Sequence, residues 1–189
     1  HRHHGHTLFL DMTADHNSHR ILDCTCGGRS IWTDGNKHRD DTVYTDMRQA
    51  SADELSRNGR TFAVQPDMLA DNRRLPFAAD TFELAVYDPP HKTLPNGMES
   101  LSGPINTKYG ALHAETWQQD LHDAVTELSR VLTDQGTLVF KFADVYQDWT
   151  DVLAQLPVDP LFGTTTKKTG TQETRWFTLH ASQWGDSHD

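Results

Sequence analysis

Cysteine and long apolar runs are the scarcest features of this sequence. The chain has 189 residues and two cysteines, Cys24 and Cys26, which are separated by a single residue. That spacing is too short for an ordinary disulfide framework, and it indicates a reducing, cytoplasmic location. No apolar run approaches the ~18 to 20 residues that a membrane helix requires. The sequence shows no secretory signal peptide and predicts no membrane association.

Positive charge is also in short supply. The chain has 17 Lys and Arg residues against 27 Asp and Glu residues, which gives a net charge of -10. This balance argues against a strongly basic nucleic-acid binder. Asp outnumbers Glu and Arg outnumbers Lys, and two interpretations fit that bias. One is a halophilic, salt-adapted proteome whose acidic surfaces serve solubility; the other is an ordinary acidic cytosolic protein.

The N-terminal 19 residues are rich in histidine and begin with His1 rather than Met. Clustered histidines can bind metal, but no Cys or carboxylate framework accompanies them at zinc-site spacing. We therefore expect residues 1–19 to be a frayed extension and predict no metal site. The length fits one domain, which we place at residues 20–181, with a tail at 182–189.

Two short apolar segments each end in an acid. The segment Arg20 to Asp23 reads as a strand and is followed by small residues and the pair Gly27 and Gly28, which permit a tight turn against a ligand. A second strand, Thr42–Asp46, follows it. An acid about 20 residues beyond a glycine turn is well placed to bind ribose hydroxyls. The alternative for Asp46 is a solvated loop acid.

The next segments predict a third strand at Thr61–Val64 and a loop that contains Asp71. Its carboxylate could accept a hydrogen bond from an exocyclic amine, while Leu75 and Phe77 pack the loop against the domain. The apolar run Phe82–Tyr87 then reads as a buried strand.

That strand ends in Asp88-Pro89-Pro90-His91, and two prolines cannot continue a central strand. Asp88 is therefore expected at the carboxyl end of a strand, where open α/β sheets bind ligands. The alternative is a strand-ending turn with a capping acid. Residues 88–113 form the longest irregular stretch, read as a substrate-facing flap that carries Lys92, Lys108 and Tyr109, or else as a disordered insertion.

The C-terminal third alternates helix and strand. Lys141 lies inside one of these strands, and packing of its alkyl chain is favoured over a role in the site. The predicted elements are a helix at 115–132, a strand at 137–142, a helix at 148–156, and a hairpin of strands at 160–163 and 175–180.

Together these features resemble a class I S-adenosylmethionine-dependent methyltransferase from about Arg20 to His180. The resemblance implies an enzyme with a Rossmann-like, seven-stranded mixed α/β sheet, mostly parallel with an antiparallel C-terminal hairpin, and helices on both faces. It further implies that S-adenosylmethionine is bound by Asp23, Cys24, Thr25, Cys26, Gly27, Asp46, Met47, Asp71, Asn72 and Asp88. More loosely, the chain is similar to small solitary methyltransferases of phages and other viruses, which would place it in the host cytoplasm.

The motif Asp88-Pro89-Pro90-His91 resembles that of amino methyltransferases acting on adenine or cytosine in DNA or RNA, and it implies catalytic roles for its four residues. Two positions depart from the pattern: Thr25 replaces the first motif glycine, and His91 replaces a larger aromatic residue. Lys92, Lys108 and Tyr109 would contact the substrate. A nucleic-acid substrate also requires a positive rim, for which the candidates are Lys92, Lys108, Lys167, Lys168 and Arg175. Methylation of a protein amide or a small molecule, and a non-catalytic cofactor-binding module with a partner subunit, are the alternatives.

Overall fold

The core of the protein is a seven-stranded sheet with the order β3-β2-β1-β4-β7-β9-β8. The computed structural model describes residues 19–52, 62–102, 104–166 and 172–185. The strands are β1 (Ile21–Asp23), β2 (Thr42–Asp46), β3 (Met68–Leu69), β4 (Phe82–Tyr87), β7 (Leu132–Ala143), β8 (Phe162–Gly163) and β9 (Thr174–His180).

Strand direction confirms the predicted mixed sheet, mostly parallel with antiparallel C-terminal strands. Strands β3, β2, β1, β4 and β7 are parallel, whereas β9 is antiparallel to both β7 and β8. The strand order reverses between β1 and β4, because the chain first extends the sheet on one side of β1 and then returns to the other. In an open parallel sheet that reversal creates a ligand-binding crevice at the carboxyl ends of the strands.

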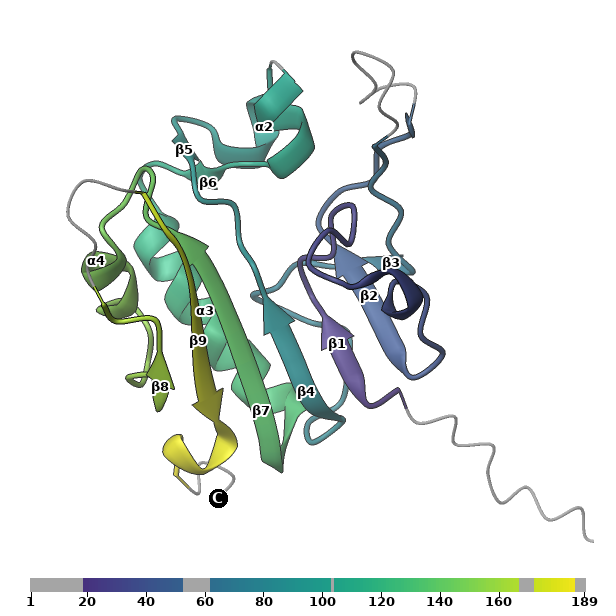
Figure 1. Ribbon diagram of the computed structural model, residues 1–189, viewed down its shortest axis with the longest axis vertical. Helices are drawn as coiled ribbons and strands as arrows, with labels where there is room; N and C mark the ends of the chain where they lie inside the picture. Colours follow the sequence, from purple (N-terminus) through teal and green to yellow (C-terminus); the bar gives the residue numbers. More distant parts are fainter. Residues whose placement is uncertain (1–18, 53–61, 103, 167–171, 186–189) are drawn as a thin grey trace, which may run out of the picture.

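One face of the sheet is covered by helix α3 (Trp117–Val131), which lies behind the strands in Figure 1. The predicted amphipathic pattern places Leu121, Val125 and Leu128 in the core, where they are fully buried. Helix α4 (Trp149–Leu153) packs on the same side, since Trp149 stacks on Phe177 of β9 at 6.2 Å.

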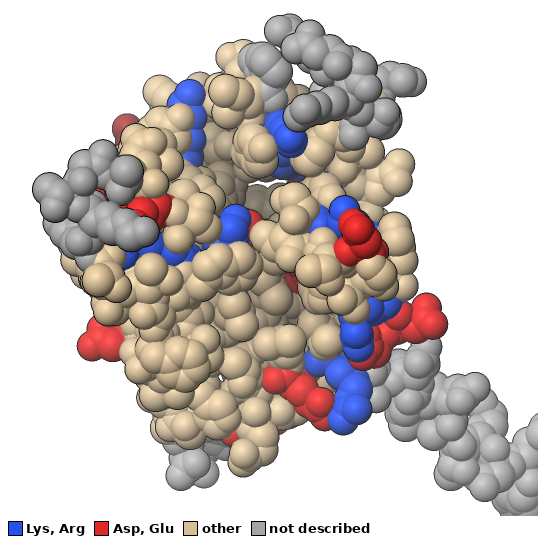
Figure 2. All heavy atoms as spheres, viewed as in Figure 1, with Lys and Arg blue, Asp and Glu red and all other residues tan. Residues whose placement is uncertain are grey.

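The opposite face is more open over β4, β7 and β9. On β7, Leu138, Phe140 and Phe142 are fully buried, whereas the alternate residues Val139 and Lys141 are only partly buried. Helices were predicted on both faces, but within the described residues no α-helix lies across this part of the sheet. Figure 2 shows that the same face has few charged side chains over the strands and is hollowed near the middle.

The predicted flap is folded rather than irregular. It contains β5 (Thr93–Leu94), the 3₁₀ turn η2 (Gly97–Ser100), helix α2 (Pro104–Tyr109) and β6 (Leu112–His113). Strands β5 and β6 pair in parallel as a separate two-stranded sheet, and the lobe stands above the carboxyl edge of the main sheet (Figure 1). The Gly- and Pro-rich sequence concealed these elements because each is only a few residues long.

Two further expectations about the chain differ from the structure. The third strand is Met68–Leu69 and not Thr61–Val64; Val64 forms only an isolated bridge with Ala50, and Thr61 lies outside the described residues. At the C-terminus, the 3₁₀ turn η3 (Ala181–Gln183) is capped by His180, and Gln183 donates to the carbonyl of Asp159. Ser182 and Gln183 are thus held to the domain where a frayed tail was expected, and residues 186–189 lie outside the described residues.

The segments 20–23, 42–46, 82–87, 117–131 and 174–180 match their predicted elements closely. In the described part of the chain, no helix is both long and apolar enough to span a membrane. The histidine-rich residues 1–18, and Lys167 and Lys168, lie outside the described residues.

The packing of α3 predicts a large cost for shortening a core side chain. Replacing Leu128 with Ala should lower the free energy of unfolding by ~2–5 kcal/mol, because the side chain is fully buried and leaves a cavity. Chemical denaturation at constant salt measures the change. Thr126→Ala, on the exposed side of the same helix, should change it by no more than ~0.5 kcal/mol. Equal losses in both variants would contradict this packing.

Candidate functional site

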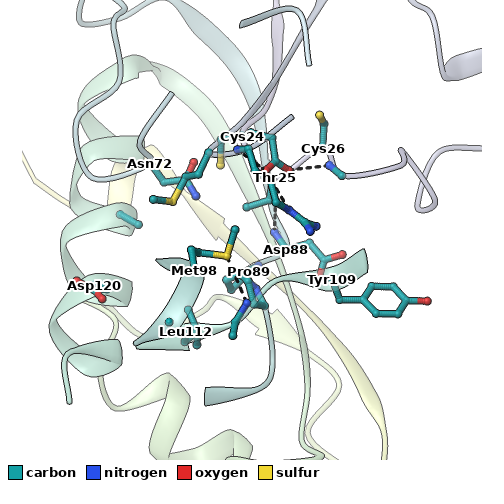
Figure 3. Close-up of a pocket in the computed structure, with 18 of the residues that line it drawn as sticks. Cys24, Thr25, Cys26, Asn72, Asp88, Pro89, Met98, Tyr109, Leu112 and Asp120 are labelled. Atoms are coloured by element: carbon teal, nitrogen blue, oxygen red, sulfur yellow. Dashed lines mark hydrogen bonds and ion pairs between the residues drawn. The ribbon is translucent and has the colours of Figure 1, made fainter. Parts of the chain in front are cut away.

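A cavity of about 280 Å³ lies at the carboxyl edge of the sheet, beneath the lobe of residues 88–113 (Figure 3). Its walls come from the turns after β1, β2 and β4, the loop after β3, the start of α3, and the lobe. The predicted site residues among its lining are Cys24, Thr25, Cys26, Gly27, Asp46, Met47, Asp71, Asn72, Asp88, Pro89, Pro90, Lys108 and Tyr109. Asp23, His91 and Lys92 do not line it.

The glycine turn after β1 is shaped by close contacts. Gly27 adopts φ +47°, and its N–H donates to Asp46 Oδ2 at 2.9 Å. At Gly28, a Cβ atom would lie 2.3 Å from a ring carbon of Phe62, so a side chain there would displace that ring. The two glycines therefore bring backbone to the rim of the cavity and tie the end of β1 to the end of β2.

The side chain of Thr25, which stands where the motif has glycine, makes a hydrogen bond that glycine could not make. Its hydroxyl oxygen accepts a 2.7 Å hydrogen bond from the backbone N–H of Asp88, and its own N–H donates to Asp23 Oδ1. A glycine at this position would leave the Asp88 N–H without that acceptor. The substitution thus joins the turn after β1 to the turn after β4, at the point where the two walls of the cavity meet.

Asp23 is fully buried and acts inside the protein rather than at the cavity wall. Trp32 Nε1 donates to its Oδ2 at 2.6 Å, and Trp32 also packs edge-on against Tyr44. Burial raises the pKa of Asp23 to about 7, although the hydrogen bonds from Trp32 and Thr25 oppose the shift. Asp23 was predicted to bind the cofactor; in the structure its carboxylate accepts from Trp32 and Thr25 and does not line the cavity.

Asp46 is placed as expected, at the carboxyl end of β2 and in the cavity wall. Its oxygens accept from the N–H groups of Gly27 and Arg48, and burial raises its pKa. Arg48 was not anticipated as a site residue. Its guanidinium lies 3.7 Å from Asp46 and donates to the carbonyls of Thr107 and Lys108. Arg48 therefore connects the end of β2 to the end of α2 at the cavity.

Asn72, and not Asp71, offers the available polar group on the far wall. Both oxygens of Asp71 accept from the guanidinium of Arg73, and these bonds lower the pKa of Asp71. The Asn72 side chain is buried, and its Oδ1 has no hydrogen-bond partner among the described residues. In Figure 3, Asn72 lies to the left of the turn of Thr25 and above Met98. Asn72, rather than Asp71, is therefore the candidate acceptor for an amine hydrogen.

The loop after Asn72 is packed down as predicted. Leu75 is buried, and the ring of Phe77 meets Phe82 edge-on at 5.0 Å. Arg130 of α3 donates to the carbonyls of Leu75 and Phe77, which anchors the loop to the helix.

The lobe lines the cavity with Met98, which sequence patterns did not single out, and with Lys108 and Tyr109, which they did. Met98 lies over the cavity, and its sulfur accepts from the N–H of Ala111 at 3.3 Å. Lys108 Nζ stands 4.7 Å from the ring of Phe62 and 5.0 Å from that of Tyr109. Tyr109 itself is 56% exposed, and Figure 3 shows its ring directed away from the other labelled residues.

Asp88 is the point at which the cavity meets the open face of the sheet. Lys141 Nζ donates to Asp88 Oδ2 at 2.8 Å, and His91 Nε2 lies 3.1 Å from Oδ1. The expectation that Lys141 serves packing is therefore wrong: strand alternation directs it toward the same edge as Asp88. The ring of His91 meets Phe142 edge-on at 5.0 Å, which orients it against the end of β7.

The described candidates for the positive rim, Lys92, Lys108 and Arg175, do not lie together. Arg175 is buried on the α4 side of the sheet, where it pairs with Asp144 and Glu173. Lys108 lies at the cavity mouth, whereas Lys92 Nζ lies 5.8 Å from the ring of Tyr146. Among the described residues, Lys141 is the cation that contacts the predicted catalytic motif.

Metal and thiol chemistry receive no support from the described residues. They contain no group of three or more His, Cys, Asp or Glu side chains that could hold a metal ion. Cys24 and Cys26 are free and buried, and burial raises the pKa of both thiols. These cysteines serve as small residues in the turn after β1.

No protein-family model and no curated protein matches this chain. Among solved structures, it is similar to a SAM-dependent methyltransferase from Methanosarcina mazei, at 10% identity over 85% of this chain and 91% of that one, with a TM-score of 0.46. TrmN from Thermus thermophilus matches at 16% identity over 85% and 43%, with a TM-score of 0.46. A SAM-dependent methyltransferase from Leishmania major matches at 15% identity over 85% and 63%, with a TM-score of 0.47.

The raised pKa of Asp23 predicts an unusual dependence of stability on pH. Between its unfolded value near 4 and its folded value of about 7, the folded protein keeps a proton that the unfolded chain has lost. The Asp23 contribution to stability therefore falls as pH rises through this window and is constant above it. Buried Asp46, whose pKa is also raised, shifts stability in the same direction.

Melting temperatures of the protein and of Asp23→Asn, from pH 4.5 to 8 at constant ionic strength, test this prediction. Asp71, whose pKa is lowered, acts in the opposite direction, so the quantity to follow is the difference between the two proteins. The variant should gain stability relative to the unaltered chain as pH rises. Parallel curves would show that Asp23 is ionised in the folded protein across this range.

Proposed function

We propose that this protein is an enzyme that transfers a methyl group from S-adenosylmethionine to the exocyclic amino group of a nucleobase, adenine N6 or cytosine N4, in DNA or RNA. The observation that carries the proposal is the placement of Asp88-Pro89-Pro90. This rigid turn at the end of β4 lines the same cavity as Gly27 and Asp46. The proposed function is inferred from the geometry of the site and not from the likeness to solved structures.

The residues of the cavity fit S-adenosylmethionine. The glycine turn after β1 presents backbone at close range, and Asp46 retains lone pairs that can accept ribose hydroxyls. The orphaned Oδ1 of buried Asn72 can accept from the adenine amino group. Leu112 and Met98 supply apolar contacts from the lobe.

Bound S-adenosylmethionine would supply an activated methyl group: the acceptor nitrogen forms the N–C bond, the C–S bond breaks, and its electron pair stays on sulfur. The protein then has mainly to position the acceptor in line with that methyl. An exocyclic amine is a poor nucleophile because its lone pair is delocalised into the ring. Hydrogen bonds to Asp88 and to the carbonyl of Pro89 favour tetrahedral geometry, and the nitrogen loses one proton through Asp88 to water.

Pro89 and Pro90 hold these acceptors in place because each proline fixes its φ angle. The backbone of Asp88 is fixed at its other side by Thr25, through the 2.7 Å hydrogen bond. The acceptor atoms are therefore preorganised before a substrate enters, which is where the proposed rate enhancement originates.

A second candidate is methylation of a protein amide side chain or a planar small molecule. It is favoured by the net charge of -10 and by the burial of Arg175, which removes one cation from the expected rim. The same acid and proline turn can orient any planar N–H group.

Incubation with tritiated S-adenosylmethionine and DNA, RNA or protein extract in separate reactions distinguishes the two candidates by the fraction that takes up label. Absence of label from every fraction would favour a non-catalytic module.

Asp46 should be required for cofactor affinity. Asp46→Ala removes two acceptor oxygens from the cavity wall and releases Gly27, so binding of S-adenosylmethionine should weaken ~10- to 100-fold in calorimetric titration. Asp41→Ala, one residue before the start of the same strand, is the matched control and should bind normally. Unchanged affinity in Asp46→Ala would remove Asp46 from the site.

Asp88 should be required for transfer but not for cofactor binding. Asp88→Ala should reduce the methylation rate ~100-fold or more, because the acceptor amine loses its main hydrogen-bond partner. Cofactor affinity, measured in the same preparation, should stay normal. Asp88→Asn keeps the shape and one acceptor oxygen, so it separates loss of the contact from loss of fold. Normal turnover in both variants would refute the proposed role.

A further inference from the structure

The carboxylate of Asp88 has two protein partners and still has room for a third. Lys141 and His91 each contact one of its oxygens, and a carboxylate offers about four lone-pair positions. The exposed fractions of the Asp88, Lys141 and His91 side chains are 18%, 18% and 24%. The group is therefore preorganised by the protein and accessible from outside.

Lys141 is set up to bind a second acceptor. Among the described residues, its ammonium makes one hydrogen bond, to Asp88, which leaves two of its three N–H donors for a ligand. It rises from the open face of the sheet, and neither it nor His91 lines the cofactor cavity. Lys141 therefore meets Asp88 from a side that a bound cofactor would leave free.

An aromatic surface stands next to this pair. Trp176 is opposite Lys141 in the β7–β9 register, so both side chains project from the same face. Lys141 Nζ lies 5.7 Å from the centre of the Trp176 ring, and Trp176 is 40% exposed. A large exposed ring beside a cation and a carboxylate provides a stacking surface for a planar heterocycle.

Nearby acids do not cancel the charge of Lys141. Asp144 and Glu173, at the same end of the sheet, pair with buried Arg175, at 3.1 and 3.5 Å. The carboxylate in contact with Lys141 is Asp88, the group that the reaction uses. The side chains Lys141, Asp88 and Trp176 thus form one donor, one acceptor and one ring face.

Resting on the proposed function, we propose that these three residues form the acceptor subsite and select an H₂N–C=N edge. Asp88 accepts from the amino group, Lys141 donates to the adjacent ring nitrogen, N1 of adenine or N3 of cytosine, and Trp176 stacks on the ring. In such an edge, the amino group and the ring nitrogen are bonded to the same carbon and are therefore close together. Lys141 and Asp88 are also close together, because they share a hydrogen bond. A simple amine lacks the acceptor that Lys141 requires.

Stacking on Trp176 has a consequence for the form of the nucleic acid. A base that presents its pairing edge to Lys141 and Asp88 cannot be paired with a complementary strand at the same time. The subsite therefore takes a single-stranded or flipped-out base. We expect single strands to bind more tightly than duplexes of the same sequence.

Matched single-stranded oligonucleotides test the subsite. One pair carries adenine or 1-deazaadenine, and the other carries cytosine or 3-deazacytosine, so that only the ring nitrogen differs. The unaltered protein, saturated with S-adenosylhomocysteine, should bind the natural base of one pair ~10- to 100-fold more tightly than its deaza analogue. Lys141→Met should lose most of that preference. Lys37→Met, at the C-terminal cap of the 3₁₀ turn η1 (Asp34–Asn36) and outside the cavity lining, should retain it.

The Trp176 variants separate stacking from edge recognition. Trp176→Ala should weaken both members of the pair equally, and Trp176→Phe should restore most of the binding. Equal binding of natural and deaza bases by the unaltered protein, or a preference that survives in Lys141→Met, would overturn the subsite. Selective binding without any methyl transfer would instead refute the proposed function and leave the subsite standing, so the two failures are distinguishable.

Discussion

The site depends on one hydrogen bond, from the backbone N–H of Asp88 to the hydroxyl of Thr25. It joins the turns that follow β1 and β4, the two strands between which the sheet order reverses. Parallel pairing places the ends of these strands side by side, and the hydrogen bond fixes the distance between the glycine turn and the proline turn. The proposed methyl donor and acceptor depend on these two turns for their relative position, so a shift of either would misalign the reaction.

Buried acids are the energetic cost of this arrangement. Burial raises the pKa values of Asp23 and Asp46, so the folded protein would be more stable without their ionisation. Hydrogen bonds from Trp32 and from the backbone of Gly27 offset part of that cost. Destabilised acids of this kind are concentrated at functional sites. Here Asp23 binds Trp32 in the segment between β1 and β2, while Asp46 forms part of the cavity wall.

The carboxylate of Asp88 has a different environment from that of Asp46. Its partners are the side chains of Lys141 and His91, whereas Asp46 accepts from backbone N–H groups. Lys141 and His91 hold the two oxygens in place without filling their hydrogen-bonding capacity. The cofactor cavity and the open face of the sheet meet at this one carboxylate. In the proposed reaction, that placement lets the two substrates approach from different sides, with the acceptor edge read by Lys141 and its ring by Trp176.

The sequence by itself determined the main strands, helix α3, the acids at strand ends, and the Asp88-Pro89-Pro90 turn, because these depend on local apolar periodicity and on backbone restrictions of Pro and Gly. It could not reveal the short elements of the lobe or the strand Met68–Leu69, whose stability comes from neighbours. Tertiary structure alone decided that Arg175 is buried and that Lys141 reaches Asp88 across 53 residues. The first depends on the pairing of β9 with β7 and the second on the pairing of β7 with β4, and no local pattern records which strands will be neighbours.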